Sequence, residues 1–221
     1  MDKGASARDA LTDMLCASGT ITSQAVEAAF RTVPRHLFLT EAPTQRAYAD
    51  RAVTIKWDRN GVPISSASQP AMVAQMLEQL EAGDGDQVLE IGTATGYNAA
   101  LLAHLVGPSG VVVTIEIEED LTERARQSLN ETGYQQVKVV RGDGHVGFPE
   151  YAPYSRIVVT AGAREVAPAW IDQLAEGGRM VVPLVNMHGD GMAVMFEMRE
   201  GVLDARSGRP CGFVPLRSSP A

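Results

Sequence analysis

The sequence predicts an α/β fold in which a doubly wound, mainly parallel sheet follows an N-terminal helical segment. Three observations lead to this prediction. Short apolar strands alternate with helical stretches from residue 70 onward, the first strand runs directly into a glycine-rich turn, and the last strands have no long helix between them. Strands that alternate with helices form parallel units, whereas strands joined by short connections pair antiparallel. We therefore expect a mostly parallel sheet with an antiparallel edge.

The first 69 residues form a separate segment in this prediction. Apolar side chains recur at helical spacing within residues 5–17 and 22–32, which predicts two short helices. Residues 34–67 are punctuated by proline and glycine and predict an irregular stretch, a kind of segment that often has a functional role. We expect residues 1–69 to be a helical and substrate-loop segment and residues 70–221 to be a ligand-binding domain, within one structural unit.

The rest of the chain follows the alternating pattern. A helix with one apolar face is expected over residues 70–82, and strands are expected where short apolar runs end at turn residues. The further helices expected span residues 97–105, 120–130 and 166–175. The strands expected span residues 87–91, 110–116, 137–140, 155–160, 178–183 and 193–199.

Charge and hydropathy exclude several classes of protein. The chain has 19 basic and 27 acidic residues and a formal net charge of −8. Nucleic-acid-binding proteins usually present a basic face, so we expect no nucleic-acid partner. No apolar run reaches the roughly 18 residues of a membrane span, and the N-terminus has no apolar signal segment. We expect a cytoplasmic protein with no membrane partner.

Cysteine and histidine show no metal-binding pattern. Cys16 and Cys211 lie far apart in the chain, which is typical of two reduced thiols. The histidines also lack the spacing of metal ligands. They are His36, His104, His145 and His188. We therefore expect no bound metal.

The glycine-rich turn Gly92–Gly96 predicts a nucleotide-like ligand. It joins a strand to a helix, so its main chain and the free N–H groups of the helix start can approach a ligand closely. Glu90 ends the preceding strand, and Glu116 ends the next one, where a carboxylate can accept from both hydroxyls of a ribose. Ala94 stands where a nicotinamide-binding turn needs glycine, and the chain has no P-loop motif. A tight turn beside two surface acids is the alternative interpretation.

Arg141-Gly-Asp-Gly144 follows the third strand of the predicted sheet. In a doubly wound fold this loop lies beside the adenine of a nucleotide, so Asp143 is a candidate to accept a hydrogen bond from the adenine amino group. Without the other motifs, the same residues would be interpreted as a surface turn.

Several stretches resemble the protein-L-isoaspartate (D-aspartate) O-methyltransferase family, over nearly the whole chain. Some of these stretches are short and are not specific to the family when taken alone. The combination of Ala47–Arg51, Ser68–Pro70 and the glycine-rich turn, in this order, is specific to it. The matching stretches are Val33–Phe38, Ala47–Arg51, Ser68–Pro70, Val88–Tyr97, Gly142–Gly144, Gly147–Tyr154, Ile157–Ala161, Gly177–Arg179 and Phe213–Leu216.

The resemblance implies a Rossmann-like class I methyltransferase sheet, with residues 70–221 binding S-adenosyl-L-methionine, released as S-adenosyl-L-homocysteine. It implies that an N-terminal helical segment covers the substrate cleft and that Ser68 is the active-site hydroxyl. The expected cofactor-binding residues are Glu90, Gly92, Thr93, Ala94, Gly96, Tyr97, Asn98, Glu116, Ile117, Gly142, Asp143, Gly144 and Thr160.

One stretch differs from the usual family pattern. The family usually carries Gly-Gln-Thr-Ile-Ser-Gln-Pro, whereas this chain has Ile64-Ser-Ser-Ala-Ser-Gln-Pro70. This serine-rich variant looks like the branch that tailors ribosomally made peptides, such as those of lanthipeptide and ATP-grasp pathways. That resemblance implies methylation of an aspartyl side chain in a modified peptide, and the ester then closes to a succinimide. Repair-type methylation of isoaspartate in proteins is the alternative.

The methyl acceptor is expected to meet the serine-rich run. A carboxylate is already ionised at neutral pH, so the enzyme must mainly orient it, and the hydroxyls of Ser65, Ser66 and Ser68 are candidate holders. In the alternative interpretation, Ser68 only caps the helix that starts at Pro70. The expected substrate-binding residues are Arg51, Lys56, Trp57, Arg59, Ile64 and Ala161.

Other functions stay open at this point. A small-molecule O-methyltransferase would use the same cofactor domain, and a peptide-binding module would keep the fold without the chemistry. A nucleic-acid amino-methyltransferase is disfavoured because Thr160-Ala-Gly-Ala163 stands where its Asn/Asp-Pro-Pro-aromatic motif would be. The expected partner is a peptide or protein with aspartate or isoaspartate, and the favoured oligomeric state is a monomer.

Overall fold

The computed structural model describes residues 4–188 and 190–218 of the 221-residue chain. A seven-stranded sheet has the order β5-β4-β3-β6-β7-β8-β9, and a separate two-stranded sheet pairs β1 with β2. The strands are β1 Val53–Trp57, β2 Pro63–Ala67, β3 Gln87–Ile91, β4 Val111–Glu116, β5 Lys138–Arg141, β6 Tyr154–Val159, β7 Leu174–Val185, β8 Asp190–Arg199 and β9 Val202–Gly212.

The pairing of the large sheet confirms the predicted fold class. Strands β3 to β7 pair in parallel, and β7, β8 and β9 pair antiparallel at one edge. The chain builds the sheet outward from β3 to β5 and then returns to place β6 on the other side of β3. Ligands of such sheets bind at the carboxyl ends of the strands where the order reverses, here β3 and β6.

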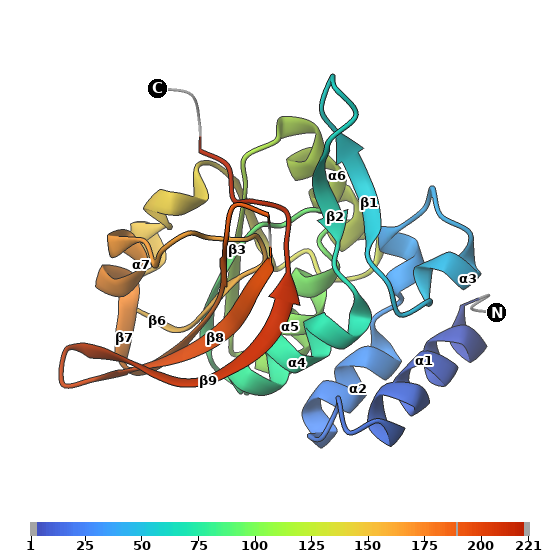
Figure 1. The fold of residues 1–221 in the computed structure, drawn as a ribbon. Helices are drawn as coiled ribbons and strands as arrows, with labels where there is room; N and C mark the ends of the chain where they lie inside the picture. Colours follow the sequence, from blue (N-terminus) through green and yellow to red (C-terminus); the bar gives the residue numbers. More distant parts are fainter. Residues whose placement is uncertain (1–3, 189, 219–221) are drawn as a thin grey trace.

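Helices cover both faces of the sheet (Figure 1). The residues of α4 and α5 belong to one hydrophobic cluster, and Trp170 of α7 belongs to a second cluster on the opposite face. The helices are α1 Ala5–Ala17, α2 Gln24–Thr32, α3 Thr44–Ala47, α4 Pro70–Leu80, α5 Tyr97–Val106, α6 Glu119–Glu131 and α7 Pro168–Gln173, with short 3₁₀ turns η1 Arg35–Phe38, η2 Gly144–Val146 and η3 Pro149–Tyr151.

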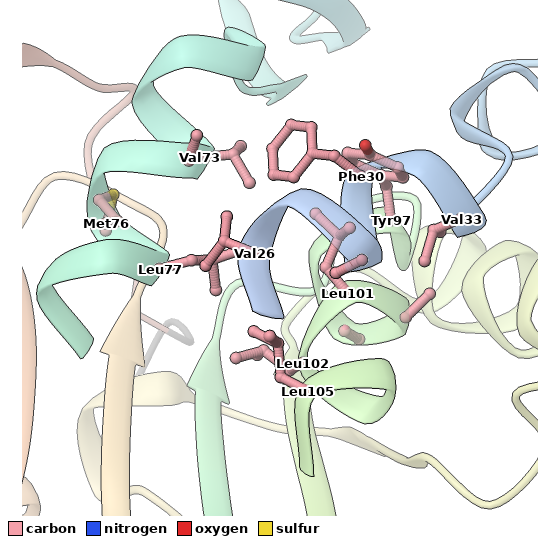
Figure 2. Packing of buried hydrophobic residues seen from close by; sticks show 14 of the residues in the cluster. Val26, Phe30, Val33, Val73, Met76, Leu77, Tyr97, Leu101, Leu102 and Leu105 are labelled. Carbon is pink, nitrogen blue, oxygen red and sulfur yellow. The ribbon is translucent and has the colours of Figure 1, made fainter. Parts of the chain in front are cut away.

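The N-terminal helices pack onto the same cluster as α4 and α5. Figure 2 shows Val26 and Phe30 of α2 between Leu77 of α4 and Leu101 of α5. The ring of Phe30 meets that of Tyr97 edge-on, with 6.4 Å between centroids. Because one cluster spans residues from both parts of the chain, the N-terminal segment is held against α4 and α5 by buried apolar surface.

Two strand pairs were not expected from the sequence. Residues 53–67, interpreted as irregular, form the hairpin β1–β2, whose turn is closed by N–H groups of Asn60 and Val62 donating to the carboxylate of Asp58. Beyond the expected strand 193–199, β9 extends the sheet with a largely exposed face. The β8–β9 turn has Glu200 at φ 51° and Gly201 at φ 73°, the left-handed pair that favours a tight hairpin.

The remaining boundaries lie close to the predicted ones. The second helix begins at Gln24 rather than Thr22, because the Ser23 hydroxyl accepts from the Val26 N–H and caps it. The helix expected over 166–175 shortens to Pro168–Gln173, and its last residues continue into β7. Within the described residues, no helix is long and apolar enough to cross a membrane.

Candidate active site

A pocket of about 990 Å³, including its open mouth, lies at the carboxyl ends of β3, β4 and β6. Three parts of the chain surround it: the glycine-rich turn after β3, the strand β2 with its following loop, and the C-terminal segment Phe213–Arg217. Of the residues predicted for the site, those in its wall are Ile64, Ser65, Ser66, Ser68, Gly92, Thr93, Ala94, Tyr97, Asn98, Glu116, Ile117, Gly144, Thr160 and Ala161. The structure therefore brings the predicted cofactor turn and the predicted serines to one pocket.

Close packing explains the glycine at the start of the turn. Gly92 has φ 103°, and a Cβ built there would lie 2.6 Å from Oγ1 of Thr160. The same Thr160 hydroxyl donates to the Gly92 carbonyl at 2.6 Å, which fixes the turn against the end of β6. A side chain at position 92 would collide with Thr160. Glycine avoids this collision and lets the main chain of the turn lie at the pocket wall.

Glu90 lies beneath the turn and is not part of the pocket wall. Its side chain is fully buried and accepts from the Thr114 hydroxyl at 2.6 Å and from the Asn98 amide at 2.7 Å. Burial raises the pKa of Glu90 from 4.5 to about 7, against the lowering effect of these two hydrogen bonds. Glu90 thus connects β3, β4 and the first turn of α5 and holds the turn from below.

Glu116 lies in the pocket wall at the end of β4. One carboxylate oxygen accepts from the Ala94 N–H at 2.8 Å, and the other accepts from the N–H groups of Ile117 and Glu118 at 3.0 and 3.1 Å. Burial raises the pKa of Glu116, and these N–H groups oppose the rise. The carboxylate is therefore held in place with part of its surface toward the pocket.

The three serines are available to a ligand. Within the described residues, the hydroxyls of Ser65, Ser66 and Ser68 have no hydrogen-bond partner, and all three residues line the pocket. The alternative that Ser68 caps α4 is wrong. Asp50 does so instead, because its carboxylate accepts from the Ala71 N–H at 2.8 Å and from the Gln69 amide at 2.9 Å.

Some predicted site residues lie outside the pocket wall. Asp143 accepts from the N–H of His145 at 2.9 Å and caps η2, while Gly142 precedes it. Gly96 packs toward Leu129 of α6, behind the turn. These three residues support the loops around the pocket, and a direct contact with a ligand stays a prediction.

Ile64 and Ala161 line the pocket, but the other four residues expected to bind the substrate lie outside its wall. Lys56 is paired with the carboxylates of Glu118 and Asp120, so its charge is already compensated. Trp57 is 54% exposed, and Arg51 and Arg59 are exposed as well. These four residues therefore lie outside the pocket wall, and a contact with the substrate stays a prediction.

Comparison with known proteins decides the family. The family model described as protein-L-isoaspartate(D-aspartate) O-methyltransferase matches residues 6–221. The chain belongs to this family. The relative from Methanopyrus kandleri, a protein-L-isoaspartate O-methyltransferase, is 42% identical over 211 residues, covering 95% of this chain and 91% of that protein. The one from Hyperthermus butylicus is 40% identical over 218 residues, covering 95% and 88%.

Solved structures agree with the fold. A protein-L-isoaspartate O-methyltransferase superposes with a TM-score of 0.85 at 34% identity over 94% of this chain, which spans 65% of that structure's length. A Plasmodium falciparum protein assigned to the same activity, in complex with S-adenosyl-L-homocysteine, gives 0.81 at 20% identity, covering 95% and 98%. The predicted enzyme class and cofactor are thereby confirmed: the chain is an S-adenosylmethionine-dependent methyltransferase.

The pocket of this methyltransferase fits its cofactor by chemistry as well as by family. A carboxylate at the end of β4 suits ribose hydroxyls, and glycines without Cβ atoms flank the space. Gly144 is one of them, since a Cβ there would lie 2.4 Å from Ile91. In the part of the chain that the structure describes, no group of three or more His, Cys, Asp or Glu residues is arranged to hold a metal ion.

Two charged residues in the methyltransferase's pocket wall were not predicted from the sequence. Arg35 of η1 and Arg217 of the C-terminal segment both line the pocket. Arg217 donates to Glu118 at 2.8 Å, and Glu118 also pairs with Lys56 of β1. The Lys56 ammonium, together with the Arg217 guanidinium, holds the pKa of Glu118 below its usual value. One carboxylate thus joins the hairpin and the C-terminal segment on either side of the pocket.

Proposed function

We propose that this chain transfers a methyl group to the free α-carboxylate of an isoaspartyl residue in a peptide or protein, as a repair-type enzyme. One observation supports this proposal most strongly. The glycine-rich turn and three serine hydroxyls line the same pocket, and within the described residues these hydroxyls have no hydrogen-bond partner. The names of the relatives from Methanopyrus kandleri and Hyperthermus butylicus support the isoaspartyl substrate.

The proposed reaction needs orientation more than acid–base chemistry. The cofactor supplies a methyl group on a sulfonium, which is a good leaving group, and the acceptor carboxylate is already ionised at neutral pH. Holding the acceptor in line with the methyl group lowers the barrier by about 7–11 kcal/mol in favourable cases. We assign this holding role to Ser68, with Ser65 and Ser66 beside it in β2 and the loop that follows.

The cofactor-binding roles form part of the same proposal. Glu116 accepts from the ribose hydroxyls, and the main chain of Gly92 to Ala94 lies against the amino-acid portion. The loop with Asp143 lies at the adenine, and Tyr97, Asn98, Ile117 and Thr160 complete the wall. Arg51, Lys56, Trp57 and Arg59 bind the flanking residues of the substrate at the rim. The monomeric state and the cytoplasmic location expected from the sequence belong to this proposal as well.

A second candidate substrate is an aspartyl side chain in a ribosomally made, modified peptide. The serine-rich β2 strand and the exposed Trp57 beside it favour this candidate, because they change the wall that meets the acceptor. The methyl ester would then close to a succinimide by attack of the next main-chain nitrogen, releasing methanol. A small-molecule O-methyltransferase is less favoured, because the relatives from Methanopyrus kandleri and Hyperthermus butylicus are named for a protein substrate.

Three peptides separate these candidates. The first has one isoaspartyl residue, the second has aspartate at the same position, and the third is a cyclised aspartyl peptide. Each is incubated with the enzyme and methyl-labelled cofactor. The proposal expects base-labile label on the isoaspartyl peptide only, because carboxyl methyl esters hydrolyse in mild base. Label on the cyclised aspartyl peptide alone would transfer the assignment to the tailoring activity, and base-stable label would contradict carboxyl methylation altogether.

A further inference from the structure

Arg35 is a buried cation beside the active-site serine. It is only 1% exposed, although its residue lines the pocket. Its Nε donates to the Ala47 carbonyl at 2.9 Å and its Nη2 donates to the Ser68 carbonyl at 2.8 Å. Its guanidinium carbon also lies 4.7 Å from the centre of the Tyr97 ring. One side chain therefore connects the N-terminal segment, the start of α5 and the main chain at Ser68.

The charge of Arg35 is not matched by a carboxylate. Among residues 4–188 and 190–218, no Asp or Glu forms an ion pair with it within 4.0 Å, and its Nη1 makes no hydrogen bond. Burial lowers the pKa of Arg35, but a guanidinium stays protonated at neutral pH. A buried charge without a counter-ion is strongly destabilising, so a group of this kind usually has a partner.

Neighbouring carboxylates do not fill this role. The carboxylate of Asp50 raises the pKa of Arg35 through its charge, but its oxygens already accept from the Ala71 N–H and the Gln69 amide. Glu116, on the other side of the pocket, is bonded to main-chain N–H groups. The partner that remains is an anion that enters the pocket.

We infer that Arg35 is a positioning residue for the methyl acceptor: it fixes the main chain of Ser68 and supplies the positive charge that selects a carboxylate at this point. The inference rests on the proposed function, because it takes the acceptor to be a carboxylate. Arg35 acts through Ser68 and through its charge, while Arg51, Lys56 and Arg59 remain at the rim.

The test measures whether the protein prefers an acid to the matching amide. Protein saturated with S-adenosyl-L-homocysteine is titrated with an isoaspartyl peptide and with the isoasparaginyl peptide of the same sequence, and then with the aspartyl and asparaginyl pair. We expect wild-type protein to bind the acid of one pair at least tenfold more tightly. Arg35→Met should bring that ratio close to one, because a charge-assisted contact is lost while the neutral contacts stay.

Two variants guard against a trivial loss of folding. Arg46→Met removes an exposed arginine one residue from Ala47 and should keep the wild-type ratio. Arg35→Lys keeps the charge but cannot hold both carbonyls, so it should lower the ratio several-fold. The double variant Arg35→Lys/Ser68→Ala should have nearly the same acid-to-amide binding ratio as Ser68→Ala alone, because both changes affect the same hydroxyl.

Several results would overturn the inference: equal binding of acid and amide by wild-type protein in both pairs, an unchanged ratio in Arg35→Met, or independent effects of Arg35→Lys and Ser68→Ala. Methyl transfer to the same peptides is measured separately. If the protein prefers the acid but transfers no methyl group, the proposed function is rejected and the role of Arg35 stands. If it transfers the methyl group but shows no preference for the acid, the role of Arg35 is rejected and the proposed function stands.

Discussion

Two residues of the glycine-rich turn, separated by Thr93, have a positive φ, and substitutions at the two should have opposite effects on stability. Gly92 has φ 103° with no room for a Cβ, whereas Ala94 has φ 48° and already carries one. Gly92→Ala should lower the free energy of unfolding by about 2 kcal/mol or more. Ala94→Gly should raise it by roughly 0.5–1 kcal/mol, because the strain of a left-handed alanine is relieved. Urea denaturation measures both, and changes of the same sign would contradict this description of the turn.

Glu90 should make stability depend on pH. Its pKa is 4.5 when unfolded and about 7 in the folded protein, so its contribution is fully present below pH 4.5 and is lost as the pH rises to 7. The loss corresponds to roughly 3 kcal/mol. Glu90→Gln cannot ionise, so the difference in free energy of unfolding, wild type minus variant, should fall over this range. Denaturation at pH 4.5, 6 and 7.5 checks this, and a constant difference would refute a protonated Glu90.

At the scale of elements, Glu118 joins the β1–β2 hairpin to the C-terminal segment. Removing its charge should loosen both sides of the pocket, since Lys56 and Arg217 lose a common partner. Glu118→Gln should weaken binding of S-adenosyl-L-homocysteine about fivefold, as expected for a loss of about 1 kcal/mol in a partly exposed ion pair. Added salt should reduce the wild-type affinity toward that of the variant.

Glu119→Gln is the matched control for this prediction. Glu119 is adjacent in the chain, but it pairs with the exposed Arg141 away from the pocket wall. Calorimetric titration of the wild type and both variants gives the comparison. Equal affinities for Glu118→Gln and Glu119→Gln would mean that the hairpin and C-terminal segment do not contribute to cofactor binding.

The elements that could be predicted are those with a clear period or a clear cap. Strands β3, β4 and β6 are short apolar runs before turn residues, and α4 carries one apolar face. The hairpin β1–β2 was missed because Lys56, Asp58 and Arg59 interrupt its apolar alternation, and its pairing depends on the turn at Asp58. Strand β9 is polar and exposed, so it is specified by its ladder with β8 rather than by burial.

Much of the candidate site could be predicted because strand ends and turns carry it locally. Glu116 and Gly92 follow strands directly, and the serines follow from the family resemblance. Arg35 could not be predicted, because its importance arises from three contacts with residues between 12 and 62 positions away, made only in the fold. Arg51, Lys56 and Arg59 were predicted as anchors for an anionic substrate because of their charge, but charge alone does not tell which cation reaches the pocket.

At the scale of the whole molecule, residues 4–69 should unfold together with the rest. Phe30 and Phe38 both pack on Tyr97, with ring centroids 6.4 and 5.8 Å apart. Phe30→Ala should lower the free energy of unfolding by about 3–5 kcal/mol. Far-UV circular dichroism and the fluorescence of Trp57, measured in a Trp170→Phe variant because the chain has two tryptophans, should report one coincident transition. An earlier transition of Trp57 alone would show that the hairpin segment unfolds independently.

The most direct test of the account is a crystal structure with S-adenosyl-L-homocysteine and an isoaspartyl peptide. We expect the free α-carboxylate of the isoaspartyl residue to lie in the pocket, to accept from the Ser68 hydroxyl and to face the cofactor sulfur, with Glu116 on the ribose. The flanking residues are expected to run along the hairpin past Trp57. A carboxylate held at the rim by Arg51 or Arg59, with Ser68 contacting neither ligand, would contradict it.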